Sequence, residues 1–147
     1  MPTPGYWVAL LHKRLLGTVV LNTTLGPGAS PALPAGVSVY AHCAAPSAGL
    51  ERVALLVTNL GASPSVLALP PHAARGEWVL EAAGGSGGLL SKNTTLNGAL
   101  LRAGVDGSLP PLEARPGAAR QPLQVPAYSV SFVVLEGSAA GSHCNLQ

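Results

Sequence analysis

The acidic residues are the side chains of this chain that could act in hydrolysis, and their spacing argues against it. The chain has 147 residues, and its carboxylates are Glu51, Glu77, Glu81, Asp106, Glu113 and Glu136. Cleavage of a glycosidic bond needs two carboxylates about 5 to 9.5 Å apart. Glu77 and Glu81 are the nearest pair with strand character, but four residues of strand separate them by about 13 Å. We therefore expect no catalytic pair in this chain, and we expect Glu77 and Glu81 on a solvated outer face.

The glycine-rich segment 84–88 reads Gly-Gly-Ser-Gly-Gly and matches the pattern that can carry a nucleophilic serine. That pattern works only when a strand precedes it and a helix follows it. A strand is expected before it, over 77–80. The residues after it, 89–98, contain Asn-Thr-Thr and Asn-Gly and are typical of a hairpin. A flexible glycine loop is therefore the better interpretation, and the segment also lacks the Lys-Ser/Thr ending of a phosphate-binding loop.

Cys43 and Cys144 each follow a histidine, so a zinc site and a disulfide are the two chemistries to weigh. Neighbouring residues on a strand point to opposite faces, so His42 and Cys43 cannot easily bind one metal ion. We favour a Cys43–Cys144 disulfide that leaves His42 and His143 exposed. Closing a loop of about 100 residues stabilises a protein by up to about 4.7 kcal/mol in the chain-entropy account. We expect no metal site and no cofactor.

Asn22 and Asn93 each begin an Asn-Thr-Thr glycosylation sequon. Together with the cysteines, the sequons indicate a secreted protein, unless these short patterns are chance. The first residues lack the charged and apolar regions of a signal peptide, so we expect the C-terminal piece of a longer secreted chain. Lys13 and Arg14 are weak candidates for binding an acidic polysaccharide, since a solvated helix end is the plainer interpretation.

Composition excludes two broad classes of protein. The net charge is +2, from 8 Lys and Arg against 6 Asp and Glu, and no basic stripe is present, so nucleic acid is not an expected partner. No apolar run approaches the roughly 18 residues of a transmembrane segment. The 18 glycines and 14 prolines favour many short elements joined by turns, and the 4% of aromatic residues leave a core of Val, Leu and Ala.

The hydrophobic pattern predicts one helix followed by strands. Residues 6–16 place Trp7, Leu10, Leu11 and Leu15 on one apolar stripe, and Gly17 is a natural C-terminal stop. Asn97-Gly98 lies between two short apolar runs and favours the type I′ turn of a β-hairpin over 94–101. Further strands are predicted over 18–21, 37–43, 53–58, 66–69, 78–80 and 128–135.

In the last predicted strand, Tyr128, Val130, Phe132 and Val134 are expected on one face. Several short strands separated by turns, with a single helix leading in, are typical of a mainly β protein. The sequence therefore predicts a β-sandwich preceded by one helix.

Short motifs that run in order through residues 5–144 resemble the C-terminal region of the heparanase family. The motifs are Tyr6-Trp7, Leu-Leu-His-Lys-Arg-Leu-Leu-Gly at 10–17, Val-Tyr-Ala-His-Cys at 39–43, Thr-Asn-Leu at 58–60, Gly-Leu-Leu-Ser-Lys at 88–92, Leu-Asn-Gly at 96–98, Leu-Pro-Pro-Leu at 109–112 and Pro-Ala-Tyr-Ser-Val-Ser-Phe at 126–132. Each motif is short, but their joint order is specific.

The resemblance implies a parent protein that is a retaining endo-β-glucuronidase and cleaves heparan sulfate in the extracellular matrix and the lysosome. In that family a (β/α)8 barrel carries both catalytic glutamates, and a β-sandwich follows it. Residues 1–17 would then be the last helix of a barrel missing from this chain, and 18–147 the sandwich. The implied partners are the missing barrel, a small subunit that adds a strand to the sandwich, and heparan sulfate through the parent. The chain alone is expected to be inactive and structural.

Two features of the chain depart from the family pattern. No glutamate matches a catalytic position, and residues 18–36 lack the basic cluster that is proposed to bind heparin.

The family disulfide between an early strand and the C-terminus falls on Cys43 and Cys144. The family also has a non-catalytic relative that binds heparan sulfate without cutting it. The alternative is therefore a secreted heparan-sulfate-binding or adhesion-type β-sandwich module.

Overall fold

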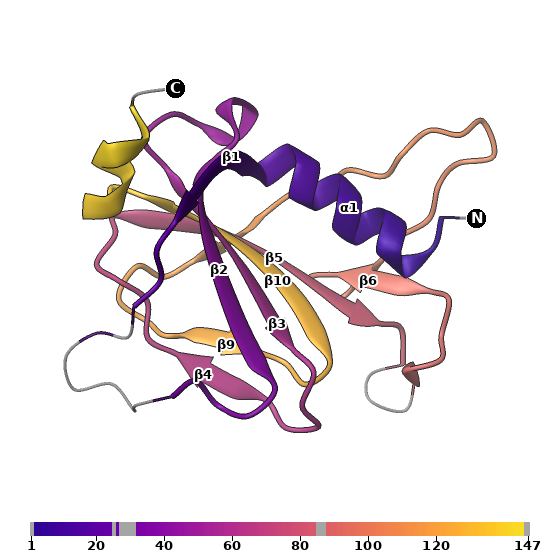
Figure 1. Cartoon of the computed structure of the whole chain (residues 1–147). Helices are drawn as coiled ribbons and strands as arrows, with labels where there is room; N and C mark the ends of the chain where they lie inside the picture. The colour runs from indigo at the N-terminus through magenta and orange to yellow at the C-terminus, as the bar shows by residue number, and fades with distance from the viewer. Residues whose placement is uncertain (1, 25, 27–31, 85–87, 146–147) are drawn as a thin grey trace.

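A computed structural model describes residues 2–24, 26, 32–84 and 88–145. The elements are helix α1 (Pro4–Leu15) and strands β1 (Leu16–Leu21), β2 (Val37–Ala44), β3 (Val53–Asn59), β4 (Ser65–Leu67), β5 (Ala74–Ala82), β6 (Thr94–Leu96), β7 (Ala99–Leu100), β8 (Arg115–Gly117), β9 (Leu123–Val125) and β10 (Ser129–Glu136), with short 3₁₀ turns η1 (Pro46–Ala48) and η3 (Ala139–Cys144). The protein is mainly β, as predicted (Figure 1).

Helix α1 packs on the sheet through the predicted apolar stripe. Trp7, Leu11 and Leu15 are buried, and Leu10 is partly buried against the same core. The helix begins two residues earlier than predicted, since Pro4 suits the first turn, where its missing N–H is not needed. It ends at Leu15. Gly17 already belongs to β1, where an added Cβ would lie 2.6 Å from the Cys43 carbonyl oxygen. A glycine is therefore needed at 17 for the close approach of two strands.

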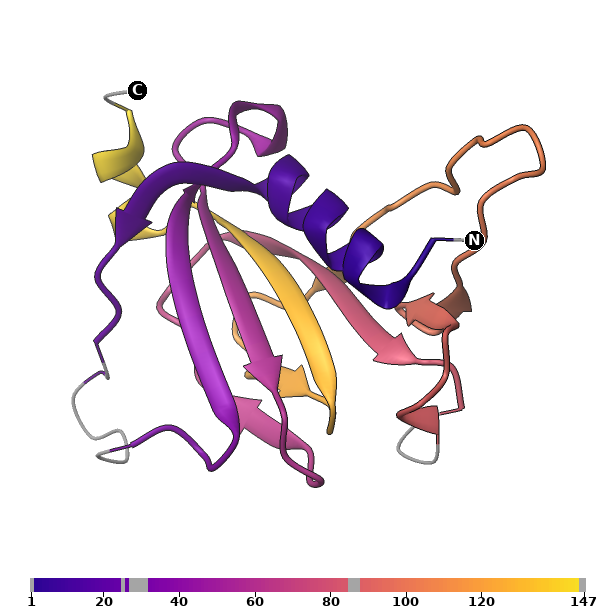
Figure 2. The same cartoon turned by 45° about the vertical axis from the view of Figure 1, so that its right-hand side comes forward.

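The large antiparallel sheet has the strand order β1-β2-β3-β10-β5-β6-β7, and β8 also pairs with β5. Figure 2 shows β2, β3 and β10 running side by side, with α1 lying across the sheet. β5 changes partner along its length: its second half pairs with β6, and its first half pairs with β8. The candidate site lies at the point of β5 where this partner changes.

The small sheet, β4 paired with β9, completes the sandwich. Val57, Leu123 and Val133 belong to the core between the two sheets. On the other face of the large sheet, Trp7 and Phe132 belong to a second core under α1. The predicted β-sandwich preceded by one helix is confirmed, and the helix shares a core with the large sheet.

The predicted hairpin is also confirmed. Leu96 pairs with Ala99, and both residues between them have positive φ, 49° at Asn97 and 85° at Gly98. These values define a type I′ turn. The long segment 101–114 then leaves the sheet and returns at β8 (Figure 1, orange).

Strand β10 is buried on both faces. Phe132 and Val134 pack under α1, whereas Val133 and Leu135 pack against the small sheet. Tyr128 was expected to extend this strand, but it precedes β10 and has a φ of 50°. Its left-handed backbone conformation takes it out of the strand alternation.

Candidate functional site around a buried ion-pair network

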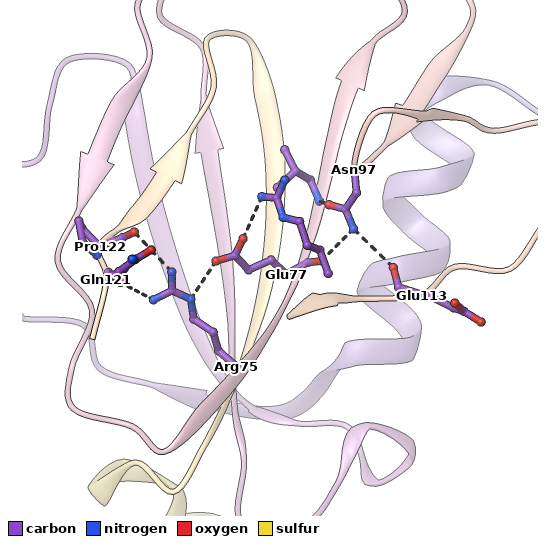
Figure 3. A network of polar contacts seen from close by, with 8 residues as sticks. Arg75, Glu77, Asn97, Glu113, Gln121 and Pro122 are labelled. Carbon is purple, nitrogen blue, oxygen red and sulfur yellow. Dashed lines mark hydrogen bonds and ion pairs between the residues drawn. The ribbon is translucent and has the colours of Figure 1, made fainter. Parts of the chain in front are cut away.

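Glu77 does not lie on a solvated face, so that prediction is wrong. It is 5% exposed. Its Oε1 accepts a hydrogen bond from Arg75 Nε at 2.8 Å, and its Oε2 accepts one from Arg115 Nη2 at 2.9 Å. Figure 3 shows this carboxylate facing guanidinium nitrogen. Arginine side chains bind both carboxylate oxygens, so Glu77 is the shared counter-ion of the two arginines.

Arg75 extends the network to the segment that leads into β9. Its side chain is 3% exposed. Its Nη1 donates to the Gln121 carbonyl oxygen at 2.5 Å, and its Nη2 donates to the Pro122 carbonyl oxygen at 3.4 Å (Figure 3). This segment covers the face of β5 that carries Arg75 and Glu77. Because the segment covers that face of β5, Arg75 and Glu77 lie inside the protein although both are charged.

Asn97 fills the place where β5 changes partner from β6 to β8. Its Oδ1 accepts the Val79 backbone N–H at 2.9 Å, and its Nδ2 donates to the Glu77 carbonyl oxygen at 3.0 Å. The same Nδ2 lies 3.5 Å from the Glu113 carbonyl oxygen (Figure 3). The amide thus occupies hydrogen-bonding positions on the edge of β5 that faces away from β10, between the residues paired with β6 and those paired with β8.

A cleft of about 670 Å³ lies between the end of α1, η1 and the strands β5 and β10. Its lining includes Leu15, Gly76 and Trp78, with Arg14 and an Arg52–Glu136 ion pair of 3.0 Å at its polar side. Of the two cations proposed for polysaccharide binding, Arg14 lines this cleft. Lys13 is exposed at the helix end and is not among the lining residues. The structure therefore does not bring them together in one cleft.

The remaining carboxylates are spread over turns and strand ends. Asp106 is fully exposed, and hydrogen bonds from the Ser108 hydroxyl and backbone N–H hold the pKa of Asp106 below its usual value of 3.8. Glu51 accepts from the Asn145 side chain, and Glu136 pairs with Arg52. Within the described ranges, no group of three or more His, Cys, Asp or Glu residues could hold a metal ion.

The structure contains the Cys43–Cys144 disulfide, which joins residues 101 positions apart. It ties β2 to the C-terminal turn η3. His143 is exposed as expected, but His42 is only half-exposed, because its Nδ1 lies 2.9 Å from the Gly17 carbonyl oxygen on the neighbouring strand. The pairing of β1 with β2 accounts for this difference.

The two sequon asparagines have different surroundings. Asn22 is exposed directly after β1, together with Thr23 and Thr24. Asn93 is half-buried, and its carbonyl oxygen accepts the Ala83 N–H at 3.0 Å. Glycosylation at either position stays a prediction.

The candidate nucleophile segment falls on Ser86, which lies outside the described residues. The described residues on its C-terminal side, 88–93, form turns that lead into β6 and contain no α-helix. The helix that a nucleophile elbow requires is therefore absent from that described stretch.

The sequence interpretation missed Arg75 and Arg115, and it identified Asn97 only as a turn residue and not as a member of the network. An Arg and a Glu two residues apart on one strand face were the available signal for the Arg75–Glu77 pair. Arg115 has no such signal, because its approach depends on pairing between β8 and β5 across 38 residues of sequence.

No protein-family model matches the chain. The chain is 34% identical over 143 residues to heparanase of Mus musculus, an alignment that covers 93% of this chain and 26% of that protein. It is 34% identical over 147 residues to baicalin-beta-D-glucuronidase of Scutellaria baicalensis, covering 98% of this chain and 26% of that protein. It is 32% identical over 146 residues to inactive heparanase-2 of Homo sapiens, covering 92% and 24%.

The fold is a β-sandwich, and the sequence is similar to part of a heparanase and to part of a β-D-glucuronidase. More particularly, most of the chain is similar in sequence to heparanases, with 34% identity to those of Mus musculus and of Gallus gallus. It spans about a quarter of the length of the curated relatives that it matches. In the described part of the chain, no helix is long and apolar enough to cross a membrane.

Proposed function

We propose that this chain is the non-catalytic C-terminal β-sandwich of a heparanase-like retaining endo-β-glucuronidase that acts on heparan sulfate. The catalytic glutamates would lie in a barrel encoded outside these 147 residues. The role of the sandwich would be to fold against that barrel and so support the stability, secretion and processing of the parent protein.

One observation carries the non-catalytic part of the proposal. Glu77 is the only acidic residue that is buried among the described residues, and both of its oxygens are bound to arginines. A retaining glycosidase needs two carboxyl groups about 5 to 5.5 Å apart, one to attack the sugar and one to exchange protons. A carboxylate held between two guanidiniums is poorly suited to either task.

The partners we propose are the barrel and a small subunit that supplies a further strand. Strand β1 stands at one end of the large sheet and exposes Val19 and Val20, the latter at 69%. An exposed apolar edge strand invites pairing with another segment. We also propose that the parent is secreted or lysosomal, in keeping with a disulfide, which persists in oxidising compartments.

The experiment begins with an antibody against a peptide from the exposed segment 102–109, used to recover the native protein from extracellular and lysosomal fractions. We expect a species several times the length of this chain that releases fragments from labelled heparan sulfate. The recombinant 147-residue chain should release none. Turnover by the recombinant chain alone, or a native protein no longer than this chain, would contradict the proposal.

A second candidate is a heparan-sulfate-binding protein without hydrolase activity. The similarity to inactive heparanase-2, at 32% identity, supports this second candidate. It predicts that the recovered native protein is retained on heparin resin at low salt, elutes as salt rises, and leaves labelled heparan sulfate intact. Retention without cleavage would therefore select this candidate.

A further inference from the structure

The turn of the hairpin combines two residues whose chemistry is labile. Asn97 is the only asparagine in the chain that is followed by glycine. Asparagine is among the thermolabile residues of proteins. Gly98 has no side chain to keep its backbone nitrogen from the Asn97 side-chain carbonyl carbon, Cγ, and an added Cβ there would meet nothing within 4 Å. The turn itself therefore offers little steric protection.

The fold protects the Asn97 amide in another way, by binding both of its ends. Oδ1 accepts the Val79 N–H at 2.9 Å, while Nδ2 donates to the Glu77 carbonyl oxygen at 3.0 Å. The Asn97 backbone N–H also donates to the Val79 carbonyl oxygen at 2.8 Å. Figure 3 shows the amide turned toward β5. Rotation of the side-chain amide toward Gly98 requires the two side-chain bonds to break, and the backbone bond holds the turn in place against β5.

We propose that Asn97 is a site of spontaneous deamidation that the folded hairpin protects and that local opening exposes. In the reaction, hydroxide removes the proton from the Gly98 nitrogen, which then bonds to Asn97 Cγ. The bond from Cγ to Nδ2 breaks, and ammonia leaves with a proton from water. Water then opens the resulting cyclic imide at either carbonyl, which gives aspartate or isoaspartate. No oxidant, reductant or enzyme is required.

The product does not fit the position that the amide holds. A carboxylate has no N–H for the Glu77 and Glu113 carbonyl oxygens, so it would place a negative oxygen against one or both of them. Isoaspartate would also lengthen the backbone of a two-residue turn. Because Leu96 and Leu101, on either side of the hairpin, are buried in the core under α1, deamidation is expected to loosen that core.

The rate of deamidation at Asn97 tests whether the folded hairpin protects the amide. The full disulfide-bonded chain is incubated in mildly alkaline buffer, folded or unfolded in guanidinium, and deamidation is followed by peptide mapping with quantification of isoaspartate. We expect the folded chain to react at least about tenfold more slowly at Asn97, as local opening controls access. Asn93, followed by threonine, is the internal control and should react slowly in both states. Equal rates at Asn97 in the two states would overturn the proposal.

Two substitutions distinguish the contribution of the turn backbone from that of the Asn97 side-chain amide. Asn97→Gly keeps a residue that accepts positive φ but lacks the side-chain bonds. Asn97→Asp places the deamidated side chain at the same position. We expect Asn97→Asp to have the lower thermal midpoint of the two, and both to lie below the unmodified chain. An Asn97→Asp variant at least as stable as Asn97→Gly would overturn the proposed consequence of the reaction.

Discussion

At the scale of single residues, Glu77 is the side chain on which the interior charges depend. It is the shared partner of Arg75, whose side chain is 3% exposed, and of Arg115, whose side chain is 51% exposed. Without the carboxylate, Arg75 would keep two backbone carbonyl partners but no counter-ion. A buried charge left without its partner is strongly destabilising.

We therefore expect Glu77→Gln to lower the free energy of unfolding by about 3 to 5 kcal/mol, the usual cost of breaking a buried ion pair from one side. The measurement is urea denaturation of the recombinant chain. Glu81→Gln, a half-exposed position on the same strand, is the matched control and should change stability by no more than about 0.5 kcal/mol. Equal effects of the two substitutions would show that Glu77 is not the shared counter-ion.

The sequence predicts individual residues well where their role is local. Asn97 and Gly98 were placed correctly because a type I′ turn needs positive φ at two successive positions, which this dipeptide tolerates. Glu77 was misplaced because strand alternation alone assigns it to the face opposite Trp78 and cannot tell whether that face is covered. The cover comes from Gln121 and Pro122, more than 40 residues away in sequence.

At the scale of elements, α1 and the large sheet stabilise each other through one apolar stripe. Leu11 is 1% exposed in the core under the helix. A 12-residue helix is marginal in isolation, so its formation depends on that packing. Loss of one buried leucine should therefore weaken the helix and the sheet face together.

Leu11→Ala is expected to cost about 2 to 5 kcal/mol of unfolding free energy, from lost burial and the cavity left behind. The exposed Lys13→Ala, two residues along the same helix, should have little effect. Hydrogen exchange of the α1 amides measures the local consequence, which should be faster exchange in Leu11→Ala alone. Unchanged exchange in that variant would contradict a helix held by its core contacts.

The long strands were predicted, whereas the short strands β8 and β9 were not. β3 and β10 stood out as apolar runs because both their faces are covered. β8 consists of Arg-Pro-Gly, a composition that disfavours a strand, and it is tolerated because it pairs only with β5 in the described sheet. β9 has only three residues, too few for a periodic signal. These two strands hold the covering segment over Glu77, which explains why the site escaped the sequence interpretation.

At the scale of the whole molecule, the disulfide closes strands β3 to β10 into one loop that spans 101 positions. Both cysteines are buried, Cys43 at 1% and Cys144 at 6% exposure, so the bond is shielded from solvent reductants. The architecture followed from sequence because strand alternation and turn residues are local. The change of partner along β5 did not follow, since it depends on contacts between distant segments.

The double variant Cys43→Ser, Cys144→Ser should unfold more easily by about 2 to 5 kcal/mol, because the unfolded chain regains the freedom that the cross-link removes. Urea denaturation of the recombinant chain measures the loss. The exposed Ser142→Ala is the control. An unchanged unfolding midpoint would mean that the cross-link does not limit the unfolded state.

The same cross-link decides what happens when the backbone is cut. Arg102 is exposed at the start of the segment between β7 and β8, well inside the loop closed by Cys43 and Cys144. A tryptic nick there leaves β5 on one fragment and its partners β8 and β10 on the other, yet the two fragments stay covalently attached. We expect one band on a gel without reductant and two with it. A severed sandwich can thus retain all of its strands.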